Sequence, residues 1–260
     1  MLKRAKVWAA VDEEVRMFPE HAREVGRVLT VEQKRLLFEV AATKPDWMVA
    51  HCAAVLAVST TCRSVELKHL RWNDVDLFNR VLNVERSKTE AGHRGIPLNA
   101  DAMAALARLW ERAQVHGATK PEHFVFPACE NEHVDPAKPQ KSWRTAWHSL
   151  VTEAGKRAGN EAAKLADRAG GDVEEARRRA TEPFHGFRFH DLRHQAITEL
   201  AEAGASNATL MALAEHMSRR MLEYYSHVRM AAKRNAVELL QTGLLKGPAD
   251  KAPKGDPAMN

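Results

Sequence analysis

Cysteine and tyrosine are scarce in this chain. Its 260 residues include three cysteines and two tyrosines, and aromatic residues make up only 6%. Cys52, Cys62 and Cys129 are odd in number and irregularly spaced, which favours neither a disulfide framework nor a CxxC metal site. We expect all three to be buried thiols.

Long apolar runs are also absent. No segment approaches the roughly 18 to 20 apolar residues that span a bilayer, and the N-terminal sequence MLKRAKVWAAVDEE lacks the apolar block of a signal peptide. We therefore expect a cytoplasmic protein with no membrane partner. The net charge of +5 and the isoelectric point near 9.2 are compatible with a polyanionic partner, but charge alone does not identify one.

The pattern of the chain predicts an α+β fold that is mainly α. Thr30 and Gln33 form a capping box at the start of a helix that continues to Thr43. The segment 46–59 is apolar almost all round and predicts a buried helix. Between residues 74 and 98, apolar and polar residues alternate around two turn-like segments, which predicts three short strands in a small antiparallel sheet. From Asn99 to about Leu245 the pattern is helical, interrupted only by a short apolar piece at 123–127.

Composition divides the chain into three parts. We expect one folded domain to cover residues 28–245, with a helical insertion at about 156–182 whose basic and acidic residues largely cancel. Residues 246–260 are rich in Pro, Gly, Ala and Lys without periodicity, so this tail is predicted to be disordered. Residues 1–27 carry mixed charges with little periodicity and precede this domain.

Four separate stretches carry residues suited to chemistry on phosphate. They are TCRSVELKHLRWND at 61–74, SKT at 87–89, FHDLRH at 189–194, and the segment 216–227, which contains both tyrosines. Breaking a phosphodiester passes through a pentacoordinate phosphorus whose oxygens carry negative charge, so the site needs fixed cations and hydrogen-bond donors. Arg63 and Arg193 offer permanently charged forks that suit phosphate, and cations around a phenol favour its nucleophilic anion.

Taken together and in this order, the four stretches resemble the tyrosine recombinase, or phage integrase, family. Its arginine, acidic residue and Trp-x-Asp pattern is matched by Arg63, Glu66, Trp72 and Asp74. The resemblance covers residues 28–245 and implies that they form the catalytic domain, with the fold of that family. It also implies that residues 1–27 are a linker, or the remnant of a missing N-terminal DNA-binding domain. One departure is Glu215, which stands where the family commonly has a glycine before its second histidine.

The resemblance implies a role for each matched side chain. Tyr225 would attack the phosphorus to give a 3′-phosphotyrosine, and Lys88 would protonate the departing DNA hydroxyl. Two further residues, Glu66 and His194, would support the site without reacting. The catalytic set implied by the resemblance is Arg63, Lys88, His190, Arg193, His216 and Tyr225. No metal, ATP or other cofactor is implied.

The adjacent Tyr224 is the alternative nucleophile. Side chains of neighbouring helical residues point about 100° apart, so only one tyrosine can face the site. Tyr225 is favoured because it lies nine residues after His216 and is followed by Ser226 and His227, as in the family. Tyr224 is interpreted as a packing or surface residue.

Other interpretations of the same residues remain open. A metal site built on His190 and His194 is disfavoured, because Asp191 stands where a zinc peptidase needs Glu and Arg193 would lie beside the metal. The whole chain could relax supercoiled DNA as a type IB topoisomerase, or bind DNA without cleaving it.

The resemblance also implies partners. These are double-stranded DNA, a homotetramer assembled on it, and in some systems accessory DNA-bending proteins, in a bacterial or phage-encoded mobile element. The segment 229–245 would dock on a neighbouring protomer or, equally, pack on its own domain.

Overall fold

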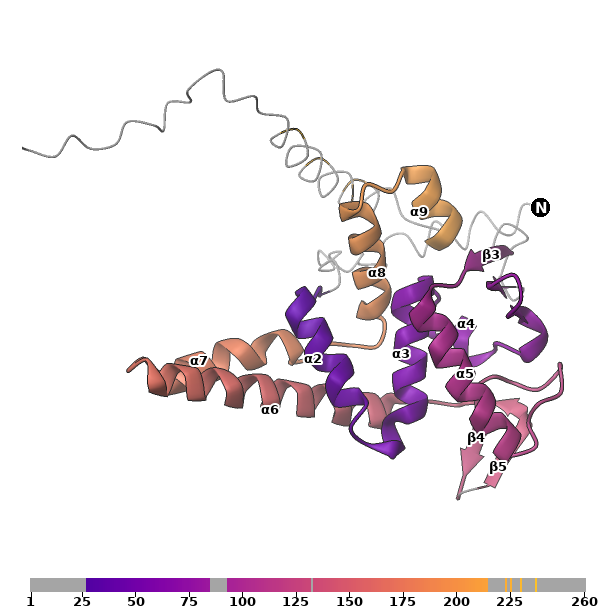
Figure 1. The fold of residues 1–260 in the computed structure, drawn as a ribbon, viewed down its shortest axis with the longest axis horizontal. Coiled ribbons are helices and arrows are strands. Elements are labelled where there is room, and N and C mark those ends of the chain that lie inside the picture. Colours follow the sequence, from indigo (N-terminus) through magenta and orange to yellow (C-terminus); the bar gives the residue numbers. More distant parts are fainter. Residues whose placement is uncertain are drawn as a thin grey trace, which may run out of the picture.

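A computed structural model describes residues 27–84, 93–131 and 133–214, together with Glu223, Tyr225, Met230 and Val237. Its helices and strands follow each other as shown in Figure 1. The α-helices are α2 (Val31–Ala41), α3 (Met48–Thr60), α4 (Ser64–Lys68), α5 (Ala100–Val115), α6 (Arg144–Arg168), α7 (Val173–Thr181), α8 (Asp191–Glu202) and α9 (Asn207–Ala214). The strands are β1 (Val75–Asp76), β2 (Val81–Val84), β3 (Arg94–Pro97), β4 (Pro127–Glu130) and β5 (His133–Pro139), and short 3₁₀ turns lie at Pro45–Trp47, Trp72–Asp74 and Glu182–Phe184.

Helix α3 is the centre of the core. Its residues Ala50, Ala53, Ala54 and Ala57 are almost fully buried, and α3 packs against both α5 and α8. Small side chains let these helices approach closely, which explains why the segment is apolar on nearly every face. The prediction of a buried helix here is confirmed, with its α-helical part at Met48–Thr60.

Helix α2 begins as predicted. Thr30 is its N-cap, and the Thr30 hydroxyl accepts the backbone N–H of Gln33 at 3.3 Å. The Gln33 side chain in turn accepts the N–H of Thr30 at 2.9 Å, which completes the capping box. The helix thus begins where its capping box predicts, and it buries Leu37 and Val40 in the core.

The predicted three-stranded sheet is present. Its order is β1-β2-β3, both pairs are antiparallel, and the register of the second pair runs from Val81↔Pro97 to Val84↔Arg94. Leu82 and Ile96 face each other and are buried, so the apolar positions of the alternating pattern pack on the core.

A second, two-stranded sheet was not predicted. Strands β4 and β5 pair antiparallel, with an irregularity between Pro127 and Ala128. The expectation that residues after 99 are helical except for one short apolar piece is therefore wrong at β5. Cys129 lies on β4 and is exposed, whereas Cys52 and Cys62 are buried, so the expectation of three buried thiols holds for two of them.

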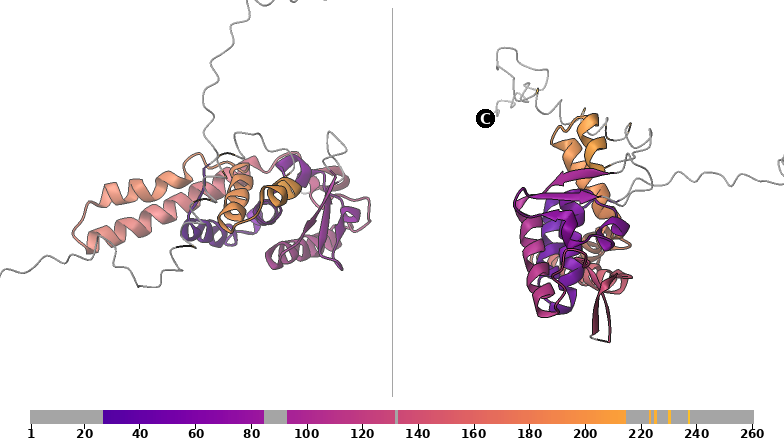
Figure 2. Two further views of the ribbon diagram at one scale, coloured as in Figure 1. Left: turned by 90° about the horizontal axis from the view of Figure 1, so that it is seen from above. Right: turned by 90° about the vertical axis from the view of Figure 1, so that its right-hand side faces the viewer.

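Helices α6 and α7 form an antiparallel hairpin that projects from the rest of the fold (Figures 1 and 2). The turn between them contains Gly170, whose φ of 68° suits glycine. The hairpin contains the segment 156–182 that the sequence suggested as an insertion, but α6 already begins at Arg144 and its first turns belong to the core. Within the described chain, no helix is long and apolar enough to cross a membrane.

The two helices of this hairpin meet closely at Gly159. A Cβ added there would lie 2.5 Å from Thr181 Oγ1 and 3.3 Å from the Arg177 carbonyl oxygen. The Thr181 hydroxyl cannot turn away freely, because it donates to the Arg177 carbonyl at 2.9 Å. Gly159 therefore sets the spacing of α6 and α7.

We predict that Gly159→Ala lowers the free energy of unfolding by about 1 to 3 kcal/mol, the usual cost of overpacking. Helix propensity alone would change it by about 1 kcal/mol in the opposite direction. Urea denaturation shows whether the free energy of unfolding falls or rises in the variant. Gly171→Ala is the control, because its Cβ would meet nothing nearer than 3.6 Å. A Gly159→Ala protein that is as stable as Gly171→Ala would contradict this packing account.

Candidate active site

The carboxylate of Glu66 is the centre of a buried ion-pair cluster. Helix α4 has only five residues, and Glu66 Oε2 accepts the backbone N–H of Arg63 at its start, at 2.7 Å. Glu66 Oε1 pairs with Arg63 Nη1 at 2.9 Å, and Oε2 pairs with Arg94 Nη2 at 2.9 Å. The Glu66 side chain is only 5% exposed. One carboxylate thus fixes two arginines from different elements.

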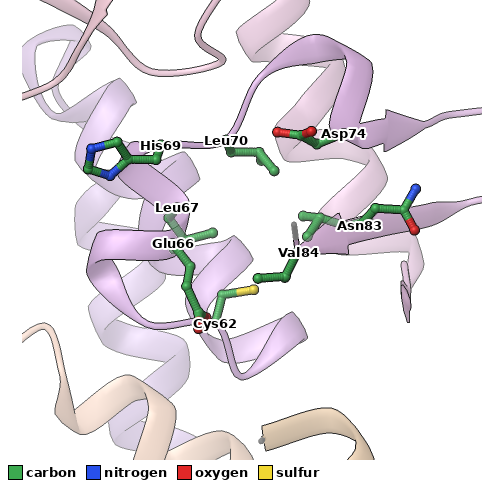
Figure 3. A pocket seen from close by; sticks show the side chains of 9 residues that line it. Cys62, Glu66, Leu67, His69, Leu70, Asp74, Asn83 and Val84 are labelled. Carbon is green, nitrogen blue, oxygen red and sulfur yellow. The ribbon is translucent and has the colours of Figure 1, made fainter. Parts of the chain in front are cut away.

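The surroundings of Glu66 strengthen these pairs. A small hollow of about 20 Å³ lies beside it between α4 and β2, lined largely by Leu67, Leu70, Val84 and the Cys62 thiol (Figure 3). Burial raises the pKa of the Cys62 thiol to about 11, so the thiol stays neutral. With this apolar wall on one side, the ion pairs of Glu66 are poorly screened by water.

Burial would by itself raise the pKa of Glu66. The hydrogen bond from Arg94, the backbone N–H of Arg63 and the charges of both arginines outweigh it, and they hold the pKa of the Glu66 carboxyl below its usual range. Glu66 is therefore ionised at neutral pH and offsets part of the positive charge gathered here.

Arg193 on α8 belongs to the same cluster. Its Nη1 donates to the Thr61 carbonyl and its Nη2 donates to the Ala214 carbonyl, so it connects the end of α3 with the end of α9. Thr61 takes a left-handed conformation with φ 57°, which turns its carbonyl out of the helical path. Burial, followed by the nearby charge of Arg63, lowers the pKa of Arg193 to about 10. The guanidinium remains charged at neutral pH.

The C-terminal carbonyls of α9 are held by three side chains. The Leu213 carbonyl accepts from Thr61 Oγ1 at 2.8 Å and from Arg94 Nε at 2.9 Å, and the Ala214 carbonyl accepts from Arg193. Backbone carbonyl oxygens carry partial negative charge, so the cationic donors Arg94 and Arg193 suit them.

The histidines of HDLRH lie at the start of α8. His190 is the N-cap residue, and its ring stands nearly perpendicular to that of His194 with their centroids 5.1 Å apart. Burial, followed by the charge of Arg193, lowers the pKa of His190. Burial and the neighbouring His190 lower the pKa of His194. Both rings are therefore mainly neutral at pH 7, and a neutral imidazole can accept or donate a proton.

Asp191 fixes the turn that presents these histidines. Its Oδ2 accepts the backbone N–H of Arg188 at 2.8 Å, and its Oδ1 pairs with Arg188 Nη2 at 2.8 Å. Asp191 is almost fully buried. Both oxygens of the Asp191 carboxylate thus bind Arg188, just before α8, so Asp191 supports the fold of the HDLRH segment.

Tyr225 lies in a separate apolar cluster. Its ring is fully buried together with Ile197 and Ala201 of α8 and Leu210 and Ala214 of α9. Ala214 belongs to this cluster, and its carbonyl accepts from Arg193. The tyrosine and the arginine cluster therefore adjoin at the end of α9.

The structure thus brings together Arg63, Glu66, Arg193, His190 and His194 of the predicted site, and it places Tyr225 next to them. Lys88 falls in the sequence between β2 and β3, and His216 follows α9 by two positions; both lie outside the described residues, as do Tyr224 and Glu215. Across the part of the chain that the structure describes, no group of three or more His, Cys, Asp or Glu side chains is arranged to hold a metal ion.

Arg94 and Thr61 are site residues that sequence reasoning missed. A signal for Arg94 existed: in the alternating strand it lies two positions before the buried Ile96, and so on the same face of the sheet. Thr61 contributes its backbone carbonyl and its hydroxyl, and no side-chain pattern indicates the carbonyl.

Comparisons with known proteins lead to the same family that the sequence motifs resemble. Residues 27–232 match the phage integrase family, and the chain belongs to this family of tyrosine recombinases. It is 25% identical over 179 residues to the integrase of Salmonella phage P22, covering 66% of this chain and 37% of that protein. It is 27% identical over 176 residues to a shufflon-specific DNA recombinase of Escherichia coli, covering 67% of this chain and 33% of that protein. The chain thus matches about a third of the length of either relative.

Solved structures have the same fold. The Tn1549 transposon integrase, determined in complex with a circular intermediate DNA, superposes with a TM-score of 0.61 at 19% identity, covering 91% of this chain and 76% of that one. The XerA recombinase superposes with a TM-score of 0.53 at 16% identity, covering 82% of this chain and 65% of that one. The predicted fold class, mainly α with a small antiparallel sheet of the tyrosine recombinase type, is confirmed.

We predict that Glu66→Gln lowers the free energy of unfolding at pH 7 by about 3 kcal/mol, because it removes a buried counter-charge of both Arg63 and Arg94. Since the folded-state pKa of Glu66 is depressed, its contribution is complete above about pH 4.5, its ordinary value, and is lost as the pH falls below it. The difference between wild type and variant should therefore shrink in acid. Urea denaturation between pH 7 and pH 4 measures it.

Glu39→Gln is the matched control for this prediction. Glu39 is half exposed and pairs with Arg35 at 3.7 Å, so its loss should cost less than about 0.5 kcal/mol. Equal losses in the two variants, or a Glu66→Gln effect that persists unchanged in acid, would contradict the ion-pair account.

Proposed function

We propose that this chain is the catalytic part of a site-specific DNA recombinase that cleaves and rejoins strands through a covalent 3′-phosphotyrosine at Tyr225. The observation that carries the proposal is the meeting of Arg63, Arg193 and His190 at one site. These residues come from the start of α4 and the start of α8, far apart in the sequence. Burial is the largest cause of the lowered pKa of His190, and the charges of Arg193 and Arg63 lower it further, so the three residues are close enough to act on one another.

The charge of this cluster suits a phosphate. Arg63 and Arg94 both pair with the carboxylate of Glu66, and Arg193 lies close enough for their charges to act on it. After burial, repulsion from Arg63 and Arg94 contributes to the depressed pKa of Arg193. A DNA phosphate relieves this repulsion, and the charge that develops on its oxygens in the transition state relieves it further. Arg63, whose side chain is 32% exposed, is accessible to a phosphate arriving from solvent.

In the proposed reaction the Tyr225 oxygen attacks the phosphorus and the bond from phosphorus to the 5′ oxygen breaks. The tyrosine proton passes to a histidine of the site, and Lys88 supplies the proton that the leaving 5′ hydroxyl takes up. A second 5′ hydroxyl reverses the step. The phosphodiester energy is conserved in the phosphotyrosine, so the reaction as proposed needs neither ATP nor a metal ion.

The burial of Tyr225 adds a requirement. Its ring is fully buried and packs against residues of α8 and α9, so we propose that the tyrosine leaves this apolar cluster before its hydroxyl reaches a phosphate. Such displacement is within the range of local opening and loop motion. DNA binding is the event that we propose to provide it.

A neighbouring pocket provides further positive charge for DNA. It has a volume of about 680 Å³ and is bordered by Ser64, next to Arg63, and by Phe189, next to His190. Lys68, Arg144, Lys156 and Arg188 contribute to its lining. These side chains support double-stranded DNA as the partner. Assembly of a homotetramer on DNA, and help from DNA-bending proteins, remain part of the proposal by likeness to the family.

The test is covalent capture of DNA. The probe is a labelled pool of nicked suicide duplexes with a randomised central sequence, so no target site need be known beforehand. We predict that the wild-type chain yields a denaturant-resistant adduct that is lost in Tyr225→Phe and retained in Tyr224→Phe. An adduct lost only in Tyr224→Phe would overturn the assignment, and no adduct at all would favour a non-cleaving DNA-binding module. Relaxation of plasmids without any preferred sequence would favour topoisomerase activity.

We also predict that binding of this chain to a short duplex is weak and steeply dependent on salt. If the basic side chains contact about four phosphates, the affinity should fall by about a hundredfold between 50 and 200 mM salt, because each contact releases a counterion. Fluorescence anisotropy with a labelled duplex measures the slope. A tight complex whose affinity is insensitive to salt would contradict this view of the DNA-binding surface.

A further inference from the structure

Arg94 is a buried arginine that connects three parts of the site. Its Nη2 pairs with Glu66 Oε2 on α4 at 2.9 Å, and its Nε donates to the Leu213 carbonyl of α9 at 2.9 Å. Arg94 itself begins β3, where it pairs with Val84 of β2. One side chain therefore links β3, α4 and the C-terminal end of α9.

Exposure separates the roles of the two arginines that share Glu66. The Arg63 side chain is 32% exposed, whereas that of Arg94 is 7% exposed. A phosphate arriving from solvent meets Arg63, while Arg94 is enclosed with Glu66 and Leu213. Arg94 therefore acts through the groups that it holds and does not contact the phosphate itself.

Arg94 also lies where two catalytic segments join the described fold. The ladder between β2 and β3 ends at the pair of Val84 and Arg94, and the segment with Lys88 connects these strands. The other contact, at Leu213, is one residue before the end of α9, and the chain from there leads to His216 and Tyr225. The same guanidinium is thus fixed to the base of both segments.

Removal of Arg94 has a definite electrostatic consequence. Glu66 would keep its buried charge with Arg63 as the remaining side-chain partner among those described above. A buried carboxylate that loses one of two counter-charges binds the other more strongly, which holds Arg63 away from a phosphate. The Leu213 carbonyl would also lose one of its two donors.

We propose that Arg94 is a positioning residue for DNA cleavage: by holding the Glu66 carboxylate and the Leu213 carbonyl, it keeps Arg63 available to the phosphate and fixes the end of α9. This inference rests on the proposed function. The family resemblance assigns no role to Arg94, and the argument depends on its contacts alone.

The test compares Arg94→Gln and Arg94→Lys with wild type in single-turnover capture of the nicked duplex pool at saturating protein. We expect Arg94→Gln to slow adduct formation by about tenfold or more, as loss of a supporting partner typically does, with duplex affinity within about twofold of wild type. Arg94→Lys should recover part of the rate, because lysine restores a charge for Glu66 but cannot span to Leu213 with a planar fork.

A double-mutant cycle with Glu66→Gln separates positioning from general damage. If Arg94 acts through Glu66, adding Arg94→Gln to Glu66→Gln should slow the reaction by much less than it slows the wild type. Arg35→Gln, which removes the same charge from an exposed position on α2, should leave the rate unchanged. Circular dichroism and thermal unfolding monitor the fold of each variant.

Several results would overturn the inference. These are a wild-type rate in Arg94→Gln, a loss of rate that merely follows weaker DNA binding or unfolding, or effects of Arg94→Gln and Glu66→Gln that multiply independently. Failure of the wild-type chain to form any adduct is a different result, because it rejects the proposed function and the role of Arg94 together.

Discussion

The site depends on the ion pairs and hydrogen bonds that the buried carboxylate of Glu66 makes. A charge removed from water is tolerated only when it is paired and hydrogen-bonded, and Glu66 meets this condition through Arg63, Arg94 and a backbone N–H. These partners come from α4 and β3, so satisfying one carboxylate fixes a short helix against the edge of a small sheet. A five-residue helix such as α4 has little stability of its own. It keeps its position because its acidic residue is held from both sides.

Hydrogen bonds of the neighbouring arginines connect this carboxylate to the end of α9. Arg94 reaches the Leu213 carbonyl and Arg193 reaches the Ala214 carbonyl, while Arg193 also holds the carbonyl of Thr61. The fold thus uses backbone carbonyls and one carboxylate to hold three arginines close together. Burial, followed by the charge of Arg63, makes the ionised form of Arg193 less favourable and lowers its pKa to about 10. Shifted pKa values of this kind are common at functional sites, where a bound substrate can supply the opposite charge.

The sequence predicted those features that local signals determine. The capping box of Thr30 and Gln33 marked the start of α2, and alternation marked the three strands around Leu82 and Ile96. Arg63, Glu66, His190 and Arg193 were found because their motifs are specific in combination, and their proximity follows from the confirmed fold. Strand β5 was missed because HVDPAKP contains two prolines and two charged residues, a composition that rarely indicates a strand.

Other features depend on tertiary contacts that no local pattern indicates. The pairing of Arg94 with Glu66 joins residues 28 positions apart, and that of Arg193 with Thr61 joins residues 132 apart. The enclosure of Tyr225 by α8 and α9 likewise depends on how two helices pack. Sequence spacing favoured Tyr225 as the proposed nucleophile, but it could not show that the ring is buried in an apolar cluster.

In the proposed reaction, DNA becomes joined to one particular side chain. Mass spectrometry of the nuclease-trimmed and protease-digested adduct identifies the residue that carries the phosphate. The account predicts a nucleotide attached through a 3′ phosphate to Tyr225, in a peptide whose Tyr224 is unmodified. A phosphate on Tyr224, on a histidine or on any other residue, or attachment through a 5′ phosphate, would contradict it.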